Sequence, residues 1–100
     1  EVINTNKKFN NDNYIVNNGT LTYTSGLITT NNITGSENGN VVIKTGDNFV
    51  VNNTISGTQL TLDNSTLYFG PNADISQASQ FNVNGGGVNV LDSKVNNYNM

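Results

Sequence analysis

Residues 57–69 read GTQLTLDNSTLYF, and this stretch contains the pattern on which the fold prediction depends. Leu60 and Leu62 stand two residues apart, the spacing of side chains on one face of a β-strand. The run Asp63-Asn64-Ser65 that follows is made of residues that favour turns, and a second apolar group begins at Leu67. The stretch therefore predicts two short strands joined by a tight turn.

The same arrangement recurs along the chain at nearly equal intervals. A first series of apolar pairs comprises Leu21/Tyr23, Val41/Ile43, Leu60/Leu62 and Phe81/Val83, and we place Val2/Ile3 one period earlier. A second series comprises Phe9, Leu27-Ile28, Phe49-Val50-Val51, Leu67-Tyr68-Phe69 and Val88-Asn89-Val90. A third comprises Tyr14-Ile15-Val16, Ile33, Ile55, Ile75 and Val95. A repeat of roughly 20 residues is typical of solenoid proteins.

The repeat favours one fold over its alternatives. No segment has the i, i+3, i+4 apolar spacing of an amphipathic helix, and an antiparallel sandwich has no reason to repeat one three-strand pattern. In a solenoid, each strand pairs in parallel with its equivalent one coil later, about 4.8 Å along the axis. We therefore predict an all-β parallel β-helix of about five coils of roughly 20 residues, with three short strands each.

The domain prediction is a single β-helix segment, residues 1–100, that is a fragment of a longer solenoid. Glu1 is not an initiator methionine, and a terminal coil of a solenoid needs a polar cap. The first coil (Val2 to Gly19) and the last (Phe81 to Met100) keep the strand pattern, so we expect coils to continue on both sides.

The composition excludes several classes of protein. The chain of 100 residues is 34% apolar and only 11% charged, with 22 Asn, no Cys and a net charge of −3. Four Lys, no Arg and a pI near 4.3 argue against nucleic-acid binding. No stretch approaches the roughly 20 apolar residues of a membrane span, so we expect no membrane insertion of this segment. The absence of Cys suits an exported bacterial protein.

Two coils, NVVIKTGD (residues 40–47) and GTQLTLDNS (residues 57–65), resemble the passenger domains of bacterial autotransporters and related filamentous adhesins. The resemblance covers nearly the whole chain and lies in Asn/Gly/Thr-rich coils that lack Cys. It implies a right-handed β-helix, secreted and held outside the outer membrane at the bacterial cell surface. It also implies a virulence-related role in adhesion, aggregation or display of appended domains.

The leading functional hypothesis is a structural and adhesive segment that acts as a rigid rod or display scaffold. Its partner would be a host surface, a glycan or another copy of the chain. The alternative is a fragment of a carbohydrate-active, pectin-lyase-like β-helix enzyme whose catalytic coils lie outside this stretch. An ice-binding module is a third candidate, but its regular Thr array is missing, because the outward positions hold Thr22, Val42, Thr61 and Asn82.

We expect no enzyme activity, metal or cofactor from this segment, because it has no His and no Arg and its carboxylates are scattered through different turns. Asp63 and Asp74 are the least poor candidates for a paired site, yet each is explained as a turn carboxylate. The run Gly85-Gly86-Gly87-Val88-Asn89 fails to match the calcium-binding nonapeptide. Lys7-Lys8 is interpreted as a short solvated turn.

One surface is a candidate for binding. If Leu27, Phe49, Leu67 and Val88 point inward, strand alternation turns their neighbours outward. Ile28, Val50 and Tyr68 would then form an apolar column at coil spacing, and exposed apolar stripes often mark a partner. If the register is shifted by one residue, this column lies inside.

Overall fold

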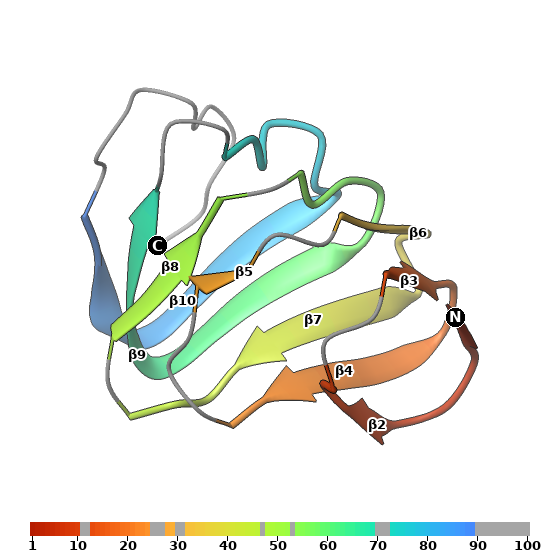
Figure 1. The fold of residues 1–100 in the computed structure, drawn as a ribbon, viewed down its shortest axis with the longest axis horizontal. Coiled ribbons are helices and arrows are strands. Elements are labelled where there is room, and N and C mark those ends of the chain that lie inside the picture. The colour runs from red at the N-terminus through yellow and green to blue at the C-terminus, as the bar shows by residue number, and fades with distance from the viewer. Residues whose placement is uncertain are drawn as a thin grey trace.

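The computed structural model shows an all-β chain whose strands stack in parallel (Figure 1). It describes residues 1–10, 13–24, 28–29, 32–46, 48–52, 54–69 and 73–89, and no helix occurs within these ranges. The strands are β1 (Val2–Ile3), β2 (Lys7–Lys8), β3 (Tyr14–Val16), β4 (Gly19–Tyr23), β5 (Ile28–Thr29), β6 (Ile33–Gly35), β7 (Gly39–Ile43), β8 (Asn48–Val51), β9 (Gln59–Phe69) and β10 (Gln80–Asn89).

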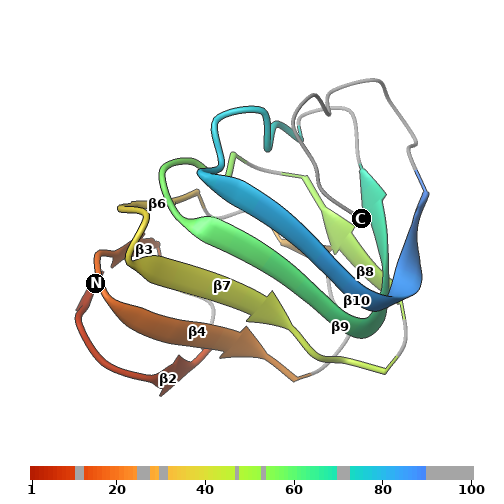
Figure 2. The ribbon, with the colours of Figure 1, turned by 180° about the vertical axis from the view of Figure 1, so that it is seen from behind.

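The strands form two sheets, and every pairing among the described strands is parallel. One sheet has the order β1-β3-β6, and the other has the order β2-β4-β7-β9-β8-β5, with β10 also paired to β9. Seen from behind, β4, β7, β9 and β10 lie side by side (Figure 2). The chain thus forms a β-solenoid-like stack of about three turns, as the repeat predicted in outline.

The interior is built from columns of like positions. Leu21, Val41, Leu60 and Phe81 are consecutive Cα partners in four neighbouring strands, and each is fully buried. In-register parallel pairing places equivalent side chains directly above one another, so each apolar side chain is covered by the next. The predicted inward column of the first series is confirmed.

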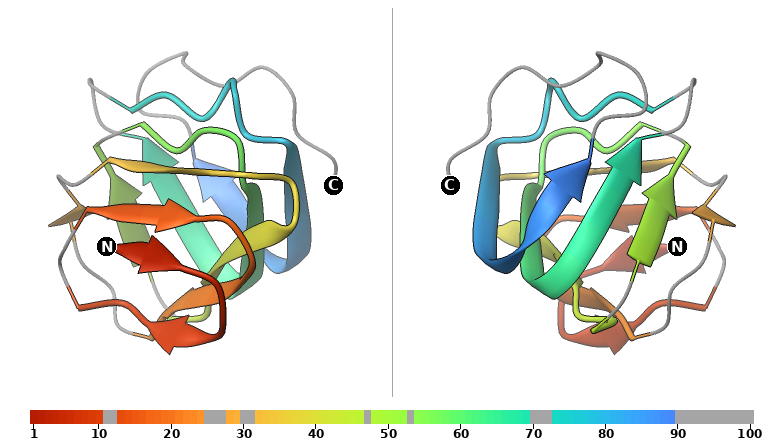
Figure 3. Two further views of the ribbon diagram at one scale, coloured as in Figure 1. Left: turned by 90° about the vertical axis from the view of Figure 1, so that its right-hand side faces the viewer. Right: turned by 90° about the vertical axis from the view of Figure 1, so that its left-hand side faces the viewer.

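The prediction of three separate strands in every coil is wrong for the long strands. Leu62 and Leu67, from the first and second series, lie in the single strand β9, and β10 is equally continuous (Figure 3). Asn64 has a φ of 51° and Gly85, one turn later, a φ of 70°. These left-handed residues bend the strand while the pairing continues on both sides.

The corner between β7 and β8 is one residue longer than the bend of β9 that it faces, and it is not a continuous strand. Ile43 pairs with Leu62 and Asn48 with Thr66, so residues 44–47 stand opposite residues 63–65. The extra residue interrupts the pairing and leaves two strands instead of one. Ser65 then fills the inside of the corner, where its buried hydroxyl accepts a hydrogen bond from the Thr45 N–H at 2.9 Å.

The first turn departs from the predicted coil that runs from Val2 to Gly19. Val2 and Ile3 pair with Ile15 and Val16 and so belong to the third series, whereas Lys7 pairs with Leu21 in the first. This turn is therefore shorter than the next one, in which Leu21 pairs with Val41. The assignment of Val2/Ile3 to the first series is therefore wrong. The assignment of Phe9 to the second series is also wrong, because the Phe9 N–H donates to the Thr22 carbonyl of β4 at 2.9 Å, which continues the pairing of β2.

Close contact between turns requires glycine at two corners. Gly19 has a φ of 76°, and a Cβ there would lie 2.4 Å from the Thr5 carbonyl carbon. Gly57 has a φ of 80°, and a Cβ there would lie 2.1 Å from the Gly35 carbonyl oxygen. Any larger residue would force the stacked backbones apart.

Candidate interaction surfaces

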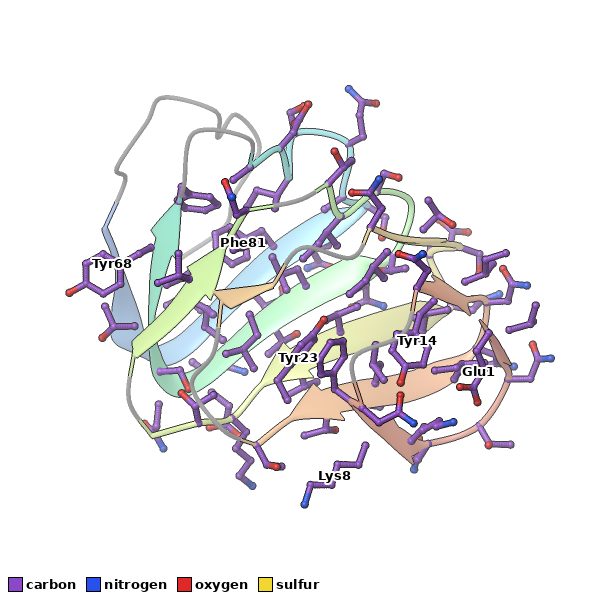
Figure 4. All side chains as sticks on the ribbon, in the orientation of Figure 1. Glu1, Lys8, Tyr14, Tyr23, Tyr68 and Phe81 are labelled. Atoms are coloured by element: carbon purple, nitrogen blue, oxygen red, sulfur yellow. The ribbon has the colours of Figure 1, made fainter. Side chains whose placement is uncertain are left out.

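The predicted column is continuous in the backbone register. Ile28 is the Cα partner of Val50, and Val50 is the partner of Tyr68. Val50 and Tyr68 are half-buried, whereas Leu67 and Phe69 on either side of Tyr68 are fully buried. Figure 4 shows the Tyr68 ring projecting away from the strands. The side chain of Ile28 lies outside the described part of the structure, as do residues Leu27 and Val95.

The register defines which face of the strand each side chain occupies. Buried Leu67 and half-buried Tyr68 follow the inward and outward alternation of a strand with one face in a core. Val50 and Tyr68 are therefore available to a partner along the side of the stack. The binding role of the column stays a prediction.

A ladder of polar side chains crosses the outer face of the first-series strands. The Thr61 hydroxyl donates to Asn40 Oδ1 at 3.0 Å, and Asn82 Nδ2 donates to Thr61 Oγ1 at 3.3 Å. Thr61 is only 8% exposed because its neighbours cover it. The repeat predicted the outward position of Thr61, but the diagonal contact with Asn40 depends on side-chain conformations that the repeat does not specify.

A hollow of about 350 Å³ lies beside β2 and β4. It combines ammonium, hydroxyl and amide groups, which can bind carboxylates, sulfates or sugar hydroxyls. Its lining residues are Asn6, Lys7, Lys8, Thr20, Thr22 and Thr24. The interpretation of Lys7-Lys8 as a solvated turn is wrong, because both residues form β2 in register with Leu21 and Thr22.

A small apolar patch lies on the outer face of the three-stranded sheet. Val2 is 56% exposed and Ile15 is 43% exposed, and the two residues are Cα partners in β1 and β3. The sequence reasoning missed this patch because it placed Val2 in a different strand series from Ile15. The pairing of Val2 with Ile15 brings the two side chains together, and a prediction of this patch would have required that pairing.

The two candidate carboxylates, Asp63 and Asp74, have structural partners. Asp63 lies 3.8 Å from the Lys44 ammonium, at the exposed corner of β9. Asp74 Oδ1 accepts from the Ser76 N–H at 2.9 Å and from the Ser76 hydroxyl at 2.6 Å, so it stabilises its own turn. Among the described residues, no three His, Cys, Asp or Glu side chains gather to hold a metal. Asp12, Asp47 and Asp92 lie outside the described residues.

Among the described residues, one ionisable group in the core has a strongly shifted pKa. Tyr23 is 1% exposed, and its phenol ring stacks on Phe9 with the ring centroids 3.9 Å apart. Burial raises the pKa of the Tyr23 hydroxyl well above its ordinary value, and the neighbouring Tyr14 adds to this effect. A phenol that is protonated at all physiological pH values contributes to packing and does not act as a base.

No protein-family model, curated protein or solved structure matches this chain. Across the described ranges, no helix is long and apolar enough to cross a membrane. The features that bear on function are the stacked architecture and the side chains that it turns outward.

Proposed function

We propose that this chain is a structural and adhesive segment of a secreted or surface-exposed bacterial protein of the autotransporter type. In this proposal it is a right-handed parallel β-helix of about five coils, located outside the cell. It acts as a rigid rod or display scaffold that holds binding surfaces away from the surface to which the protein is attached.

The observation that carries the proposal is the unbroken inward column of Leu21, Val41, Leu60 and Phe81. Each turn is joined to the next by a parallel backbone ladder and by a buried side chain, so bending the stack would break both. A scaffold of this kind leaves its outward residues free to vary, because the core does not depend on them.

The adhesive surface in this proposal is the column of Ile28, Val50 and Tyr68. Half-buried Val50 and Tyr68 offer an aliphatic and an aromatic side chain at the spacing of adjacent strands. Tyrosine is enriched in protein interfaces because it combines an apolar ring with a polar hydroxyl. The column suits a host-surface protein, a glycan or the same column on another copy.

The experiment replaces Ile28, Val50 and Tyr68 together by Thr and measures adhesion of protein-coated beads to host cells and to immobilised glycans. Val2→Thr with Ile15→Thr is the matched control, because it removes exposed apolar groups from a different face. Circular dichroism verifies that both variants keep the β-fold. We expect adhesion to fall for the column variant only.

Three results would count against the proposal. Unchanged adhesion of the column variant would remove the column as an interface, and equal loss in both variants would indicate a nonspecific apolar effect. Release of reducing ends or unsaturated products from a polysaccharide by the unmodified segment would favour the carbohydrate-active alternative.

A further inference from the structure

A lysine occupies an inward position at one end of the core. Lys7 in β2 is the Cα partner of fully buried Leu21, in the column that continues through Val41. Parallel strands in register turn equivalent residues to the same side, so Lys7 stands where every later turn has an apolar residue. Its neighbour Lys8 pairs with outward Thr22 and points away from the molecule (Figure 4).

The side chain of Lys7 lies across this end of the core instead of extending into solvent. Its ammonium forms an ion pair with the Glu1 carboxylate and lies 5.9 Å from the centre of the Tyr14 ring. The Lys7 side chain is 33% exposed, so its methylene groups are partly covered. Lysine commonly covers apolar surface in this way while its charged group stays in contact with water.

An aromatic cluster closes the rest of this end. Phe9 stacks on Tyr23 and also contacts Tyr14, whose ring centroid is 5.6 Å away. The Tyr14 hydroxyl and the Asn10 side chain are hydrogen-bonded, which holds the short first turn over the rings. Together, Lys7, Phe9 and Tyr14 cover Leu21 and Tyr23, which would otherwise be exposed on this side of the core.

Without a charge at this position, the edge strands β1 and β2 could pair with a strand of another chain. The outer edges of β1 and β2 carry backbone groups of the type that pair with a second chain, and proteins use inward-pointing charges to prevent this. A second copy that stacked here would bury the ammonium of Lys7 and its ion pair with Glu1. Taking such a pair out of water costs more than the pairing returns unless further partners are supplied.

We infer that Lys7 blocks this edge of the described stack against parallel or antiparallel strand addition by a second copy of the chain. This goes beyond the proposed adhesive role, which concerns the side of the stack. A single copy keeps the ion pair between Lys7 and Glu1 in contact with water, whereas a stacked pair would bury it.

The experiment compares the self-association of Lys7→Leu and Lys8→Leu by sedimentation velocity over a range of concentrations. The two variants remove the same charge and add the same apolar side chain to one strand, at an inward and an outward position. We expect Lys7→Leu to associate at least about tenfold more tightly than Lys8→Leu, the factor that corresponds to roughly 1.4 kcal/mol. The unmodified chain should behave as Lys8→Leu does.

Lys7→Thr and Lys8→Thr form a second matched pair. Thr is compatible with a β-strand and does not add a large apolar side chain. Here too the Lys7 variant should associate more tightly, and Lys7→Arg should match the unmodified chain. Equal association of the Lys7 and Lys8 variants within both pairs would overturn the inference. Because Ile28, Val50 and Tyr68 are unchanged in all these proteins, their adhesion remains a separate test of the proposed function.

Discussion

The first turn and the later turns of the stack cover the apolar core in different ways. From β4 to β9, each inward residue of the first series is followed by its equivalent in the next turn, as Val41 is by Leu60. The first turn is shorter, and Lys7, Phe9 and Tyr14 cover the core through contacts that no other described turn repeats. The later turns therefore repeat one packing pattern, whereas the packing of the first turn depends on individual side chains.

The largest expected effect is in the middle of the stack. Leu60→Ala removes a fully buried side chain between Val41 and Phe81, and neither neighbour can move without disturbing its own turn. We expect the free energy of unfolding to fall by about 2–5 kcal/mol in a denaturant titration. Thr66→Ala, at an outward position of the same strand, is the control and should cost less than about 1 kcal/mol. Equal losses would contradict the assignment of the interior.

Phe9→Ala tests the end of the core in the same way. Phe9 is only partly buried, so its truncation should cost less than that of Leu60, about 1–2 kcal/mol, including the lost ring stacking on Tyr23. Thermal unfolding followed by circular dichroism measures this difference. Phe9→Leu keeps most of the apolar surface and should recover part of the loss. A cost as large as that of Leu60→Ala would mean that the two regions do not differ.

Tyr23 links the two regions, and its raised pKa predicts a loss of stability in alkali. An unfolded tyrosine ionises near pH 10, whereas the buried Tyr23 hydroxyl stays protonated. Below pH 10 both states bind the proton, and above it only the folded state does. Stability should therefore fall by up to about 1.4 kcal/mol per pH unit above pH 10. Tyr23→Phe should remove this contribution, and parallel stability profiles from pH 8 to 11 for the two proteins would contradict the prediction.

The smallest effect is expected at the exposed corner of β9. Asp63 and Lys44 are 3.8 Å apart, and their side chains are 35% and 66% exposed. Asp63→Asn should cost no more than about 0.5 kcal/mol at low salt, and the cost should shrink further as added salt screens the pair. Lys44→Gln and the double variant complete a thermodynamic cycle. A coupling energy above about 1 kcal/mol would show that this corner is stabilised by charge.

The repeat predicted the inward column because alternation in a strand turns residues such as Leu60 and Leu62 to the same face. It failed in the first turn because it assumed a constant turn length. Only four residues separate Phe9 from Tyr14, whereas nine separate Tyr23 from Ile33, so the first turn is shorter than the next one. The spacing can be read from the sequence, but the strand series to which each residue belongs depends on which segments pair.

The candidate surfaces were predictable to different degrees. The outward positions of Val50 and Tyr68 follow from strand alternation alone. The hydrogen bond between Asn40 and Thr61 connects positions that are diagonal in the sheet, so it depends on side-chain conformations. The position of Lys7 over Leu21 depends on the register of a two-residue strand, which contains too few residues to specify its own pairing.

The longer corner between β7 and β8 has a practical consequence for engineering. Pairing resumes beyond residues 44–47 although they exceed the opposite corner by one, so the core tolerates a change in chain length there. Gly46 is exposed, and no atom lies within 4 Å of the position that a Cβ would occupy. Exposed, loosely contacted turns are the positions where proteins accept insertions. A short peptide epitope grafted beside Gly46 would be held at a fixed height along the stack, which makes this corner a position for vaccine or affinity-tag display.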